Sequence, residues 1–291
     1  MQSKIAFIGL GSMGGHMVHH LLAADHRVTV YARRADAMAP FVAAGALAAN
    51  SPADAAHDAD FIMTNLTATA DVDAILLGAR GVIESARAGS IVCDFSTIDA
   101  GATRAIAARF AERGIDFLDC PVSGGGKAAK AATLTVLVGG NAAVLAKARP
   151  LLEKLGNNIF HMGAVGAGQI TKACNQIVQV VNIQGIAEAM LFAQNNGVDT
   201  AKVVDALMAG MAGSKMLDLM GRKMAARDFA AGIEARLHHK DFGLVCNIAE
   251  QQGLPMPAVA LVHGQLSKLM DHGWGTMDTC NLLRVLEDQQ T

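Results

Sequence analysis

The chain has 291 residues, of which 52% are hydrophobic and 17% charged, and its formal net charge is −2. This length is sufficient for two domains and a substantial core, while a near-neutral charge without a basic run argues against a nucleic-acid partner. The first apolar stretch gives way to glycines around Leu10, so it is too short for a signal peptide or a membrane span.

Apolar runs alternate with stretches of helical periodicity from the amino terminus to about residue 160. The apolar runs predict strands at residues 4–8, 28–31, 61–64, 90–95, 116–118, 135–138 and 159–161. Helical patterns separate most of these strands, for example at residues 12–24, 34–44, 99–113 and 142–155. This alternation predicts an α/β fold in which a doubly wound Rossmann domain has helices on both faces of a mainly parallel sheet.

The pattern changes after the glycine-rich segment 163–168. Residues 169–195 contain no proline and a single glycine, which predicts a helix of about 27 residues and ~40 Å. Further helical patterns without a convincing strand follow at residues 200–209, 214–225, 237–252, 257–272 and 276–289. We therefore expect residues 1–162 to form an NADP-binding domain and residues 163–291 an all-helical domain for substrate binding and oligomerisation, joined by the long interdomain helix.

A glycine motif, Gly9-Leu-Gly-Ser-Met-Gly14, lies between the first predicted strand and the first predicted helix. In this context the spacing G-x-G-x-x-G indicates dinucleotide binding. Gly9 would permit the tight turn, Gly11 the approach of a pyrophosphate, and Gly14 close packing of helix on strand. The pyrophosphate would bind the N–H groups at the positive end of the helix. The predicted cofactor-binding residues here are Gly9, Leu10, Gly11, Ser12, Met13 and Gly14.

The end of the second strand indicates which nucleotide binds. Ala32-Arg33-Arg34 follows the glycine motif by about 20 residues, where an NAD site usually has a carboxylate that binds the ribose. The absence of that carboxylate and the presence of Arg33 suit the 2′-phosphate of NADP(H). We expect Arg33 to bind this phosphate and Arg34 to stack on the adenine. The alternative is a pair of solvated arginines at a strand end.

Lys172 is the strongest candidate for acid–base chemistry, because it lies in the first turn of the predicted long helix. Asn175 and Gln176 follow at i+3 and i+4, so both amides share the face of the ammonium group. Partial burial beside the positive end of the helix dipole is expected to make the ammonium group a stronger acid, closer to the working range. Such a lysine can protonate the alkoxide formed when a carbonyl is reduced. The alternative is a surface lysine on an amphipathic helix.

A second glycine-rich segment, Asp119-Cys-Pro-Val-Ser-Gly-Gly-Gly126, begins at the end of a predicted strand. Ligands of open α/β sheets bind at this carboxyl edge. Ser123 with the N–H groups of Gly124 and Gly125 is predicted to form a nest for a substrate carboxylate. The alternative is a flexible glycine turn.

Other polar residues are candidates for contact with the cofactor. The segment Asp94-Phe-Ser-Thr97 ends another predicted strand, and the hydroxyls of Ser96 and Thr97 are expected to meet substrate or the nicotinamide ribose. For Thr97, a position beside a helix cap is the alternative. In the helical half, Lys240 is expected to reach the cofactor, or else to form a solvated ion pair with Asp241.

Taken together, these motifs resemble the β-hydroxyacid dehydrogenase family, of the 3-hydroxyisobutyrate dehydrogenase and tartronate semialdehyde reductase type. Four blocks match in order across nearly the whole chain: Gly9 to Gly14, Asp119 to Gly125, Gly166 to Asn175, and His239 to Asp241. Patterns in the second half, such as Gly273-Trp-Gly-Thr-Met-Asp278, are most similar to the tartronate semialdehyde reductase branch.

The resemblance implies an NADPH-dependent reductase of a small 3-oxo acid that also works in reverse as a 3-hydroxyacid dehydrogenase. It implies that Lys172 is the catalytic acid/base, that Asn175 supports it, and that Thr97 and Lys240 contact the cofactor. It also implies that the substrate carboxylate is held by Ser123, Gly124 and Gly125. Two alternatives are an imine reductase on the same fold, against which Lys172 argues, and a non-catalytic NADP-binding sensor or interaction module.

The chain departs from the family pattern at three places. Leu66, expected beside the nicotinamide, is followed by Thr67 where the family often has proline. Lys127 and Lys130 make the segment after Gly125 more basic than usual, which is compatible with a second acidic group on the substrate. Gln176, expected to contact substrate, stands where many members have asparagine.

The five cysteines are scattered, without the C-x-x-C spacing of metal or redox sites, and are expected to be reduced core residues of a cytoplasmic protein. The histidine pairs are adjacent along the chain and therefore chelate poorly, so no metal is expected. The long helix is apolar in more directions than one core needs, which predicts a homodimer or homotetramer through the helical domain, with the active site in the cleft between the domains. The residues concerned are Ile177, Val178, Val180, Val181, Ile183 and Ile186.

Overall fold

The structure is a computed structural model that describes residues 2–290. The chain divides into two compact units, Met1–Lys172 and Ala173–Thr291. The division falls inside helix α8 (Ala167–Asn195), one turn after that helix begins. The predicted boundary at residues 162 and 163 lies before this helix, at the end of strand β9.

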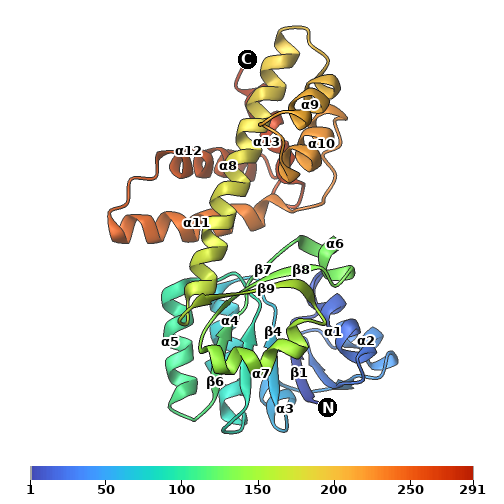
Figure 1. The fold of residues 1–291 in the computed structure, drawn as a ribbon, viewed down its shortest axis with the longest axis vertical. Helices are drawn as coiled ribbons and strands as arrows, with labels where there is room; N and C mark the ends of the chain where they lie inside the picture. Colours follow the sequence, from blue (N-terminus) through green and yellow to red (C-terminus); the bar gives the residue numbers. More distant parts are fainter. Residues whose placement is uncertain (1, 291) are drawn as a thin grey trace. The chain divides into compact units, whose positions relative to one another are not determined.

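The first unit contains a nine-stranded sheet with the order β3-β2-β1-β4-β5-β6-β8-β7, and β9 pairs with β8 (Figure 1). Neighbouring strands are parallel except where β8 runs antiparallel to β6 and β7. The predicted α/β fold with a doubly wound sheet is confirmed. The strands are β1 (Lys4–Ile8), β2 (Arg27–Tyr31), β3 (Leu47–Ala48), β4 (Phe61–Thr64), β5 (Ile91–Asp94), β6 (Asp116–Asp119), β7 (Val122–Ser123), β8 (Leu134–Gly139) and β9 (Gly156–Gly163).

Alternate side chains of the central strands enter two different cores, which is why these strands are continuous apolar runs. In β1, Ile5 and Phe7 pack into a core shared with helices α1 and α7, whereas Ala6 and Ile8 pack into a core shared with α3, α4 and α5. The helices of this unit are α1 (Gly14–Ala23), α2 (Ala39–Ala43), α3 (Pro52–Ala56), α4 (Thr69–Leu77), α5 (Ala100–Ala111), α6 (Gly125–Lys130) and α7 (Ala142–Leu152), with 3₁₀ turns η1 (Ala35–Met38) and η2 (Val82–Glu84).

Several short elements differ from the sequence prediction. The helix expected at 34–44 is a 3₁₀ turn followed by α2, which begins where Pro40 lacks the N–H that a continuous helix would need. The glycine turn expected after Ser123 leads directly into α6. Strands β3 and β7 have two residues each, too few to produce a period in the sequence.

The second unit is helical, and no strand occurs in its described part. Its core gathers Val180, Ile183 and Met190 of α8 against Phe242 and Leu266. The single helices expected at 214–225 and 276–289 are each interrupted, the first by a π-helical turn and the second by a 3₁₀ turn. The elements after α8 are α9 (Thr200–Ala209), η3 (Leu217–Gly221), α10 (Arg222–Ala225), α11 (Ala235–Gln252), α12 (Pro257–Asp271), η4 (Thr279–Asn281) and α13 (Leu282–Asp288).

Helix α8 is the only helix of the described chain that is long and apolar enough to span a membrane, by length and composition alone. Core helices of soluble proteins meet the same criterion, and 44% of its most apolar window is buried. The cysteines are all free. Cys93, Cys120 and Cys280 are buried as expected, but Cys174 is exposed, which corrects the expectation that all five are core residues.

Candidate active site

The glycine motif forms the turn between β1 and α1, beside the residues that follow β4. Gly9 has φ +102°, and a Cβ there would lie 2.2 Å from the carbonyl oxygen of Asn65. A Cβ on Gly14 would lie 2.0 Å from the carbonyl oxygen of Gly9, so the helix start and the turn are in close contact. Around Gly11, by contrast, a Cβ would meet no protein atom within 4 Å. The backbone is therefore accessible where a pyrophosphate would need to approach.

The start of α1 suits an anion. Within the described residues, no side chain caps this helix at Met13 and no acidic residue lies in its first turn. The Gly15 N–H donates to the carbonyl oxygen of Gly11 at 3.0 Å, while the N–H groups just before it face neither a side-chain cap nor a repelling carboxylate. Together with the clearance at Gly11, this arrangement fits the pyrophosphate of a nicotinamide dinucleotide.

Both arginines after β2 are exposed at the edge of the sheet. Arg33 Nη1 lies 3.6 Å from Asp71 Oδ1 of α4, and Arg34 Nη1 lies 3.6 Å from Asp36 Oδ2. Exposed ion pairs of this length hold a side chain weakly. The Arg33 guanidinium is therefore able to exchange its carboxylate for a phosphate.

The segments that follow β4 and β5 are fastened to each other through Asp94. This buried carboxylate accepts hydrogen bonds from Thr64 Oγ1 at 2.7 Å and from the N–H and hydroxyl of Ser96. The Ser96 hydroxyl in turn accepts the N–H of Leu66 at 2.8 Å. Burial raises the pKa of Asp94 to about 6, against the opposing effect of the hydrogen bonds from Ser96 and Thr64.

This network changes the interpretation of Ser96. The sequence predicted that its hydroxyl meets substrate or cofactor, whereas the structure turns that hydroxyl inward, where it ties the two segments together. Thr97, the next residue, is only partly buried. The contacts of Asp94 were not predicted, although an acidic residue at the last position of a buried strand was a signal of them.

Asp119, at the end of β6, holds the start of α8. Its two carboxylate oxygens accept the N–H of Gly166 at 2.8 Å and the N–H of Gln169 at 2.9 Å. A Cβ on Gly168 would lie 2.7 Å from Asp119 Oδ2, so only glycine permits this approach. Burial raises the pKa of Asp119, and the backbone N–H donors oppose that rise. Lys172, one turn further along the helix, is 9% exposed.

The segment predicted to bind a carboxylate lies beside the glycine motif. Gly124 and Gly125 have φ values of +128° and +65°, a backbone conformation that glycine favours. A Cβ on Gly126 would lie 3.8 Å from the carbonyl oxygen of Ser12. His20 of α1 also contacts the carbonyl oxygen of Ala129 at 3.0 Å, which fastens α6 to α1. The first unit thus gathers the two glycine segments and the ends of β4, β5 and β6.

In the second unit, the amides that follow Lys172 are part of a separate polar network. Gln176 is buried and donates to Asp241 Oδ2 at 2.6 Å, while Lys240 Nζ lies 2.8 Å from Asp241 Oδ1. Asn175 donates to Gln176 Oε1 at 2.9 Å. Gln176 was predicted to contact substrate, but its amide N–H is engaged within the protein. The ion pair of Lys240 with Asp241, which the sequence offered as the alternative to cofactor contact, is present, but the burial of Asp241 and its bond with Gln176 were not predicted.

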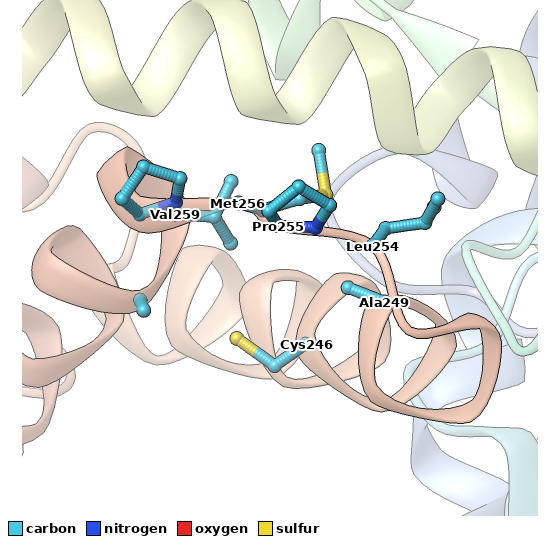
Figure 2. A pocket seen from close by; sticks show the side chains of 8 residues that line it. Cys246, Ala249, Leu254, Pro255, Met256 and Val259 are labelled. Atoms are coloured by element: carbon cyan, nitrogen blue, oxygen red, sulfur yellow. The ribbon is translucent and has the colours of Figure 1, made fainter.

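An apolar cavity of about 430 Å³ lies in the second unit, between the end of α11 and the start of α12. Figure 2 shows Cys246, Leu254 and Met256 around it. Its wall contains none of the predicted site residues and no charged side chain, so it is unsuited to an anionic substrate. Among residues 2–290, no group of three or more His, Cys, Asp or Glu side chains is placed to hold a metal ion.

Comparison with known proteins identifies the family. Residues 4–163 match the NAD-binding domain of 6-phosphogluconate dehydrogenase, and residues 166–286 match the NAD-binding domain of NADP-dependent 3-hydroxyisobutyrate dehydrogenase. The chain is 36% identical to NAD-dependent L-serine dehydrogenase of Pseudomonas aeruginosa, over 99% of each chain. It is 35% identical to 2-hydroxy-3-oxopropionate reductase of Escherichia coli, over 98% of this chain and 97% of that protein.

A solved structure resembles the whole chain. The 3-hydroxyisobutyrate dehydrogenase of Mycobacterium tuberculosis, determined with L-serine, has a TM-score of 0.91 and 31% sequence identity. The match covers 98% of this chain and 99% of that one. The glycine turn, the fastened strand ends and these relatives agree: the chain belongs to the β-hydroxyacid dehydrogenase family and is an NAD(P)-dependent oxidoreductase that acts on CH–OH groups.

Proposed function

We propose that this enzyme is an NADPH-dependent reductase of a small 3-oxo acid similar to tartronate semialdehyde, and that it works in reverse as a 3-hydroxyacid dehydrogenase. The observation that carries the proposal is the buried Lys172 in the second turn of α8. Asp119 anchors the start of that helix to the end of β6. A buried amine fixed beside the carboxyl edge of a parallel sheet suits proton transfer to a ligand bound at that edge.

The reaction assigns a separate task to each group. Bound NADPH supplies the hydride that reduces the aldehyde carbon. Lys172 Nζ donates a proton to the carbonyl oxygen, which becomes the hydroxyl, and the lysine then takes a proton from water. Ser123 and the N–H groups of Gly124 and Gly125 hold the substrate carboxylate. Fixing both ends of the substrate reduces the entropy that the reaction step must lose.

The remaining polar residues have supporting roles in this proposal. Asn175 supports Lys172 and the substrate, and Gln176 orients Asn175 through the hydrogen bond between their amides. Thr97 and Lys240 contact the cofactor. Residues 1–162 bind NADP, and residues 163–291 complete the substrate site and form the contacts between subunits.

The preference for NADPH rests on the end of β2. Ala32 leaves no carboxylate at the position where NAD enzymes usually bind the ribose, and Arg33 is exposed and only loosely paired. A guanidinium fork binds phosphate in a bidentate manner. In this proposal Arg34 stacks on the adenine, and the backbone from Gly9 to Gly14 and at Leu66 contacts the rest of the dinucleotide.

A second candidate is oxidation of L-serine with NAD. It is favoured by the 36% identity to an L-serine dehydrogenase that uses NAD, over nearly the whole chain. An imine reductase and a non-catalytic NADP sensor are less well supported. Lys172 stands where imine reductases on this architecture generally have another residue, and a sensor would need neither a proton donor nor a carboxylate nest.

Assembly and location follow from surface and composition. Of the six α8 residues from which the assembly was predicted, Val180, Ile183 and Ile186 are instead buried in the chain's own helical core, and Val178 is the one that is largely exposed, at 71%. Phe192 of α8 and Leu261 of α12 are also exposed, at 73% and 58%. Large apolar side chains in these positions suit burial against a second copy, so we assign a homodimer or homotetramer formed through the helical unit. The five free cysteines suit the reducing cytoplasm.

The proposal is tested by a spectrophotometric substrate panel. Reduction of tartronate semialdehyde, methylmalonate semialdehyde, succinic semialdehyde and glyoxylate is measured with NADPH and with NADH. Oxidation of L-serine and 3-hydroxyisobutyrate is measured with NADP⁺ and NAD⁺. The highest kcat/KM is expected for tartronate semialdehyde with NADPH. A clear preference for L-serine with NAD⁺ would establish the second candidate instead.

A further inference from the structure

Gln169 occupies a place in the fold that the reaction described above does not use. It is the third residue of α8, it is 3% exposed, and it lies three residues before Lys172 on the same helix. Residues at this spacing share one face of a helix. Contacts that fix Gln169 therefore also fix the turn of the helix that carries Lys172.

Both ends of the Gln169 amide are bound to one short segment of backbone. Its Nε2 donates to the carbonyl oxygen of Ser96 at 2.8 Å, and its Oε1 accepts the N–H of Ile98 at 3.1 Å. These two bonds span Thr97, the residue assigned to the cofactor. The amide thus links the segment beside the nicotinamide to the helix that carries the proton donor.

The two ends of this link are themselves held. Asp119 accepts the Gln169 N–H at 2.9 Å, which anchors the start of the helix. On the other side, Asp94 binds Ser96 through its N–H and its hydroxyl. Gln169 is the side chain that joins these two anchored segments, and all of the residues concerned lie in the first compact unit.

We infer that Gln169 is a positioning residue for proton transfer, which sets Lys172 against the segment 96–98 and thereby against the reacting carbonyl. This inference rests on the proposed role of Lys172. A misplacement of about 1 Å can cost on the order of 100-fold in rate, because reacting groups must meet at near-contact distance. Loss of both amide bonds is therefore expected to lower kcat far more than it lowers cofactor affinity.

The test replaces the amide while keeping the length of the side chain. Gln169→Met removes both hydrogen bonds, and activity is expressed per cofactor-binding site titrated with NADPH so that unfolded protein does not count. We expect kcat to fall roughly 10- to 100-fold, the KM for NADPH to stay within about threefold, and the solvent deuterium isotope effect on kcat to rise. A variant with kcat within about twofold of wild type would overturn the inference.

Helix α8 offers a matched control. Gln184 is 4% exposed on the same helix, and its Nε2 donates to Glu188 at 2.9 Å, within the second unit. Gln184→Met makes the same chemical change away from the segment 96–98, and its kcat is expected to match wild type. An equal loss of kcat in both variants would show a general effect on the helix and overturn the inference.

Two further measurements keep the inference separate from folding and from the proposed function. If Gln169→Met does not fold, Gln169→Asn is measured instead, because it retains the amide on a shorter side chain. Its kcat is expected to fall, but by less than the roughly 10- to 100-fold expected for Gln169→Met. Hydrogen exchange read by mass spectrometry needs no substrate. Faster exchange in both segments 96–99 and 166–172 of the Gln169 variant is expected, and unchanged exchange in either would contradict the link. Full turnover in Lys172→Ala would remove the proposed proton donor, irrespective of the Gln169 result.

Discussion

Two buried polar clusters, one at the start of α8 in the sheet unit and one around Asp241 in the helical unit, hold their side chains in different ways. In the first, the Asp119 carboxylate accepts the backbone N–H groups of Gly166 and Gln169. In the second, the Gln176 amide pairs with the side chain of Asp241. A bond to backbone fixes the path of the chain, whereas a bond between side chains can be replaced by a change of rotamer. The Asp119 contacts therefore hold a loop and a helix start, and the Asp241 contacts hold side chains on helices already formed.

Buried carboxylates of the two units also differ in whether a cation lies beside them. Lys240 lies against Asp241 in the helical unit, which gives that buried carboxylate a cation. Asp94 in the sheet unit has only neutral donors on one oxygen, and its other oxygen is buried with no hydrogen-bond partner among the described residues. An uncompensated buried carboxylate destabilises the folded state once it ionises. The sheet unit thus carries a pH-dependent cost at Asp94.

The largest expected effect concerns the residue that the sheet unit positions. Lys172→Ala should lower kcat by roughly 10²- to 10⁴-fold, as expected for loss of a general acid, with NADPH binding little changed. Steady-state kinetics and fluorescence titration of NADPH measure the two quantities. Lys240→Ala is the comparison, because it removes an ammonium group assigned to cofactor contact, and should raise the KM for NADPH with less effect on kcat. Turnover near wild type in Lys172→Ala would show that the anchored helix start has no catalytic purpose.

The second prediction concerns Asp94. Its pKa of about 6 in the folded protein exceeds the ordinary 3.8, so the folded state retains a proton that the unfolded chain has already lost. Stability therefore falls as the pH rises from about 4 through 6, by about 3 kcal/mol over the full titration. Asp94→Asn cannot titrate and therefore lacks this loss of stability. Between pH 4 and pH 8, the unfolding free energy of the variant should rise relative to that of wild type by about 3 kcal/mol.

The two units supply separate probes for this measurement. Urea unfolding at pH 4 and pH 8 is followed by far-ultraviolet circular dichroism, which reports both units. The fluorescence of Trp274, the single tryptophan, reports the helical unit. The pH-dependent difference should appear in the sheet unit's transition and leave the Trp274 transition unchanged. A pH dependence of Asp94→Asn equal to that of wild type would assign it to other groups.

The sequence predicted the fold well where a pattern is local. Apolar runs such as residues 4–8 and 61–64 coincide with strands, because burial on both faces leaves a continuous signal. The π-helical turn at Leu217–Gly221 was missed, since it depends on packing rather than on residue type.

Within the candidate site, the sequence indicated the glycine turn but missed the anchors. Three glycines at fixed spacing predict a tight turn from residue type alone, because the turn needs positions without a side chain. Asp94, Asp119 and Gln169 act instead on segments about 30 to 70 residues away. The partners of Asp119 and Gln169 are backbone atoms, which have no residue identity. Only their strand-end or helix-start positions offered a signal.

The third prediction concerns an exposed edge of the sheet unit, where no buried network acts. Loss of a charge-assisted phosphate contact costs about 1.5–3 kcal/mol. Arg33→Ala should therefore raise the Kd for NADPH by roughly 10- to 100-fold and leave NADH almost unchanged, as measured by fluorescence titration of both. Arg34→Ala is the neighbouring control, and it should weaken both cofactors slightly and equally. A wild-type preference for NADH, or equal weakening of both cofactors by Arg33→Ala, would refute the assignment.

The smallest expected effect lies in the helical unit, at His238. Thr279 Oγ1 donates to the carbonyl oxygen of Ile233 at 3.3 Å, so it accepts from His238 Nδ1, 2.8 Å away. In the neutral ring this leaves Nε2 as the acceptor for Gln179 Nε2 at 3.5 Å, a long hydrogen bond. Gln179→Leu removes this bond and also the bond that Gln179 Oε1 accepts from Asn175 Nδ2 at 3.2 Å. Both are long bonds between partly buried side chains, so the variant should cost about 1 kcal/mol in the unfolding transition of Trp274.

Thr279→Val provides the contrast, because it preserves shape at a buried position while removing the acceptor for His238 Nδ1. A buried donor deprived of its acceptor costs about 1–3 kcal/mol, so this variant should shift the Trp274 transition more than Gln179→Leu does. Neither substitution changes backbone anchoring in the sheet unit, so the Kd for NADPH should stay at the wild-type value in both. If Gln179→Leu destabilised the protein as much as Thr279→Val, a long bond between partly buried side chains would stabilise the helical unit as much as a short bond at a fully buried hydroxyl, and the distinction between these two kinds of contact would fail.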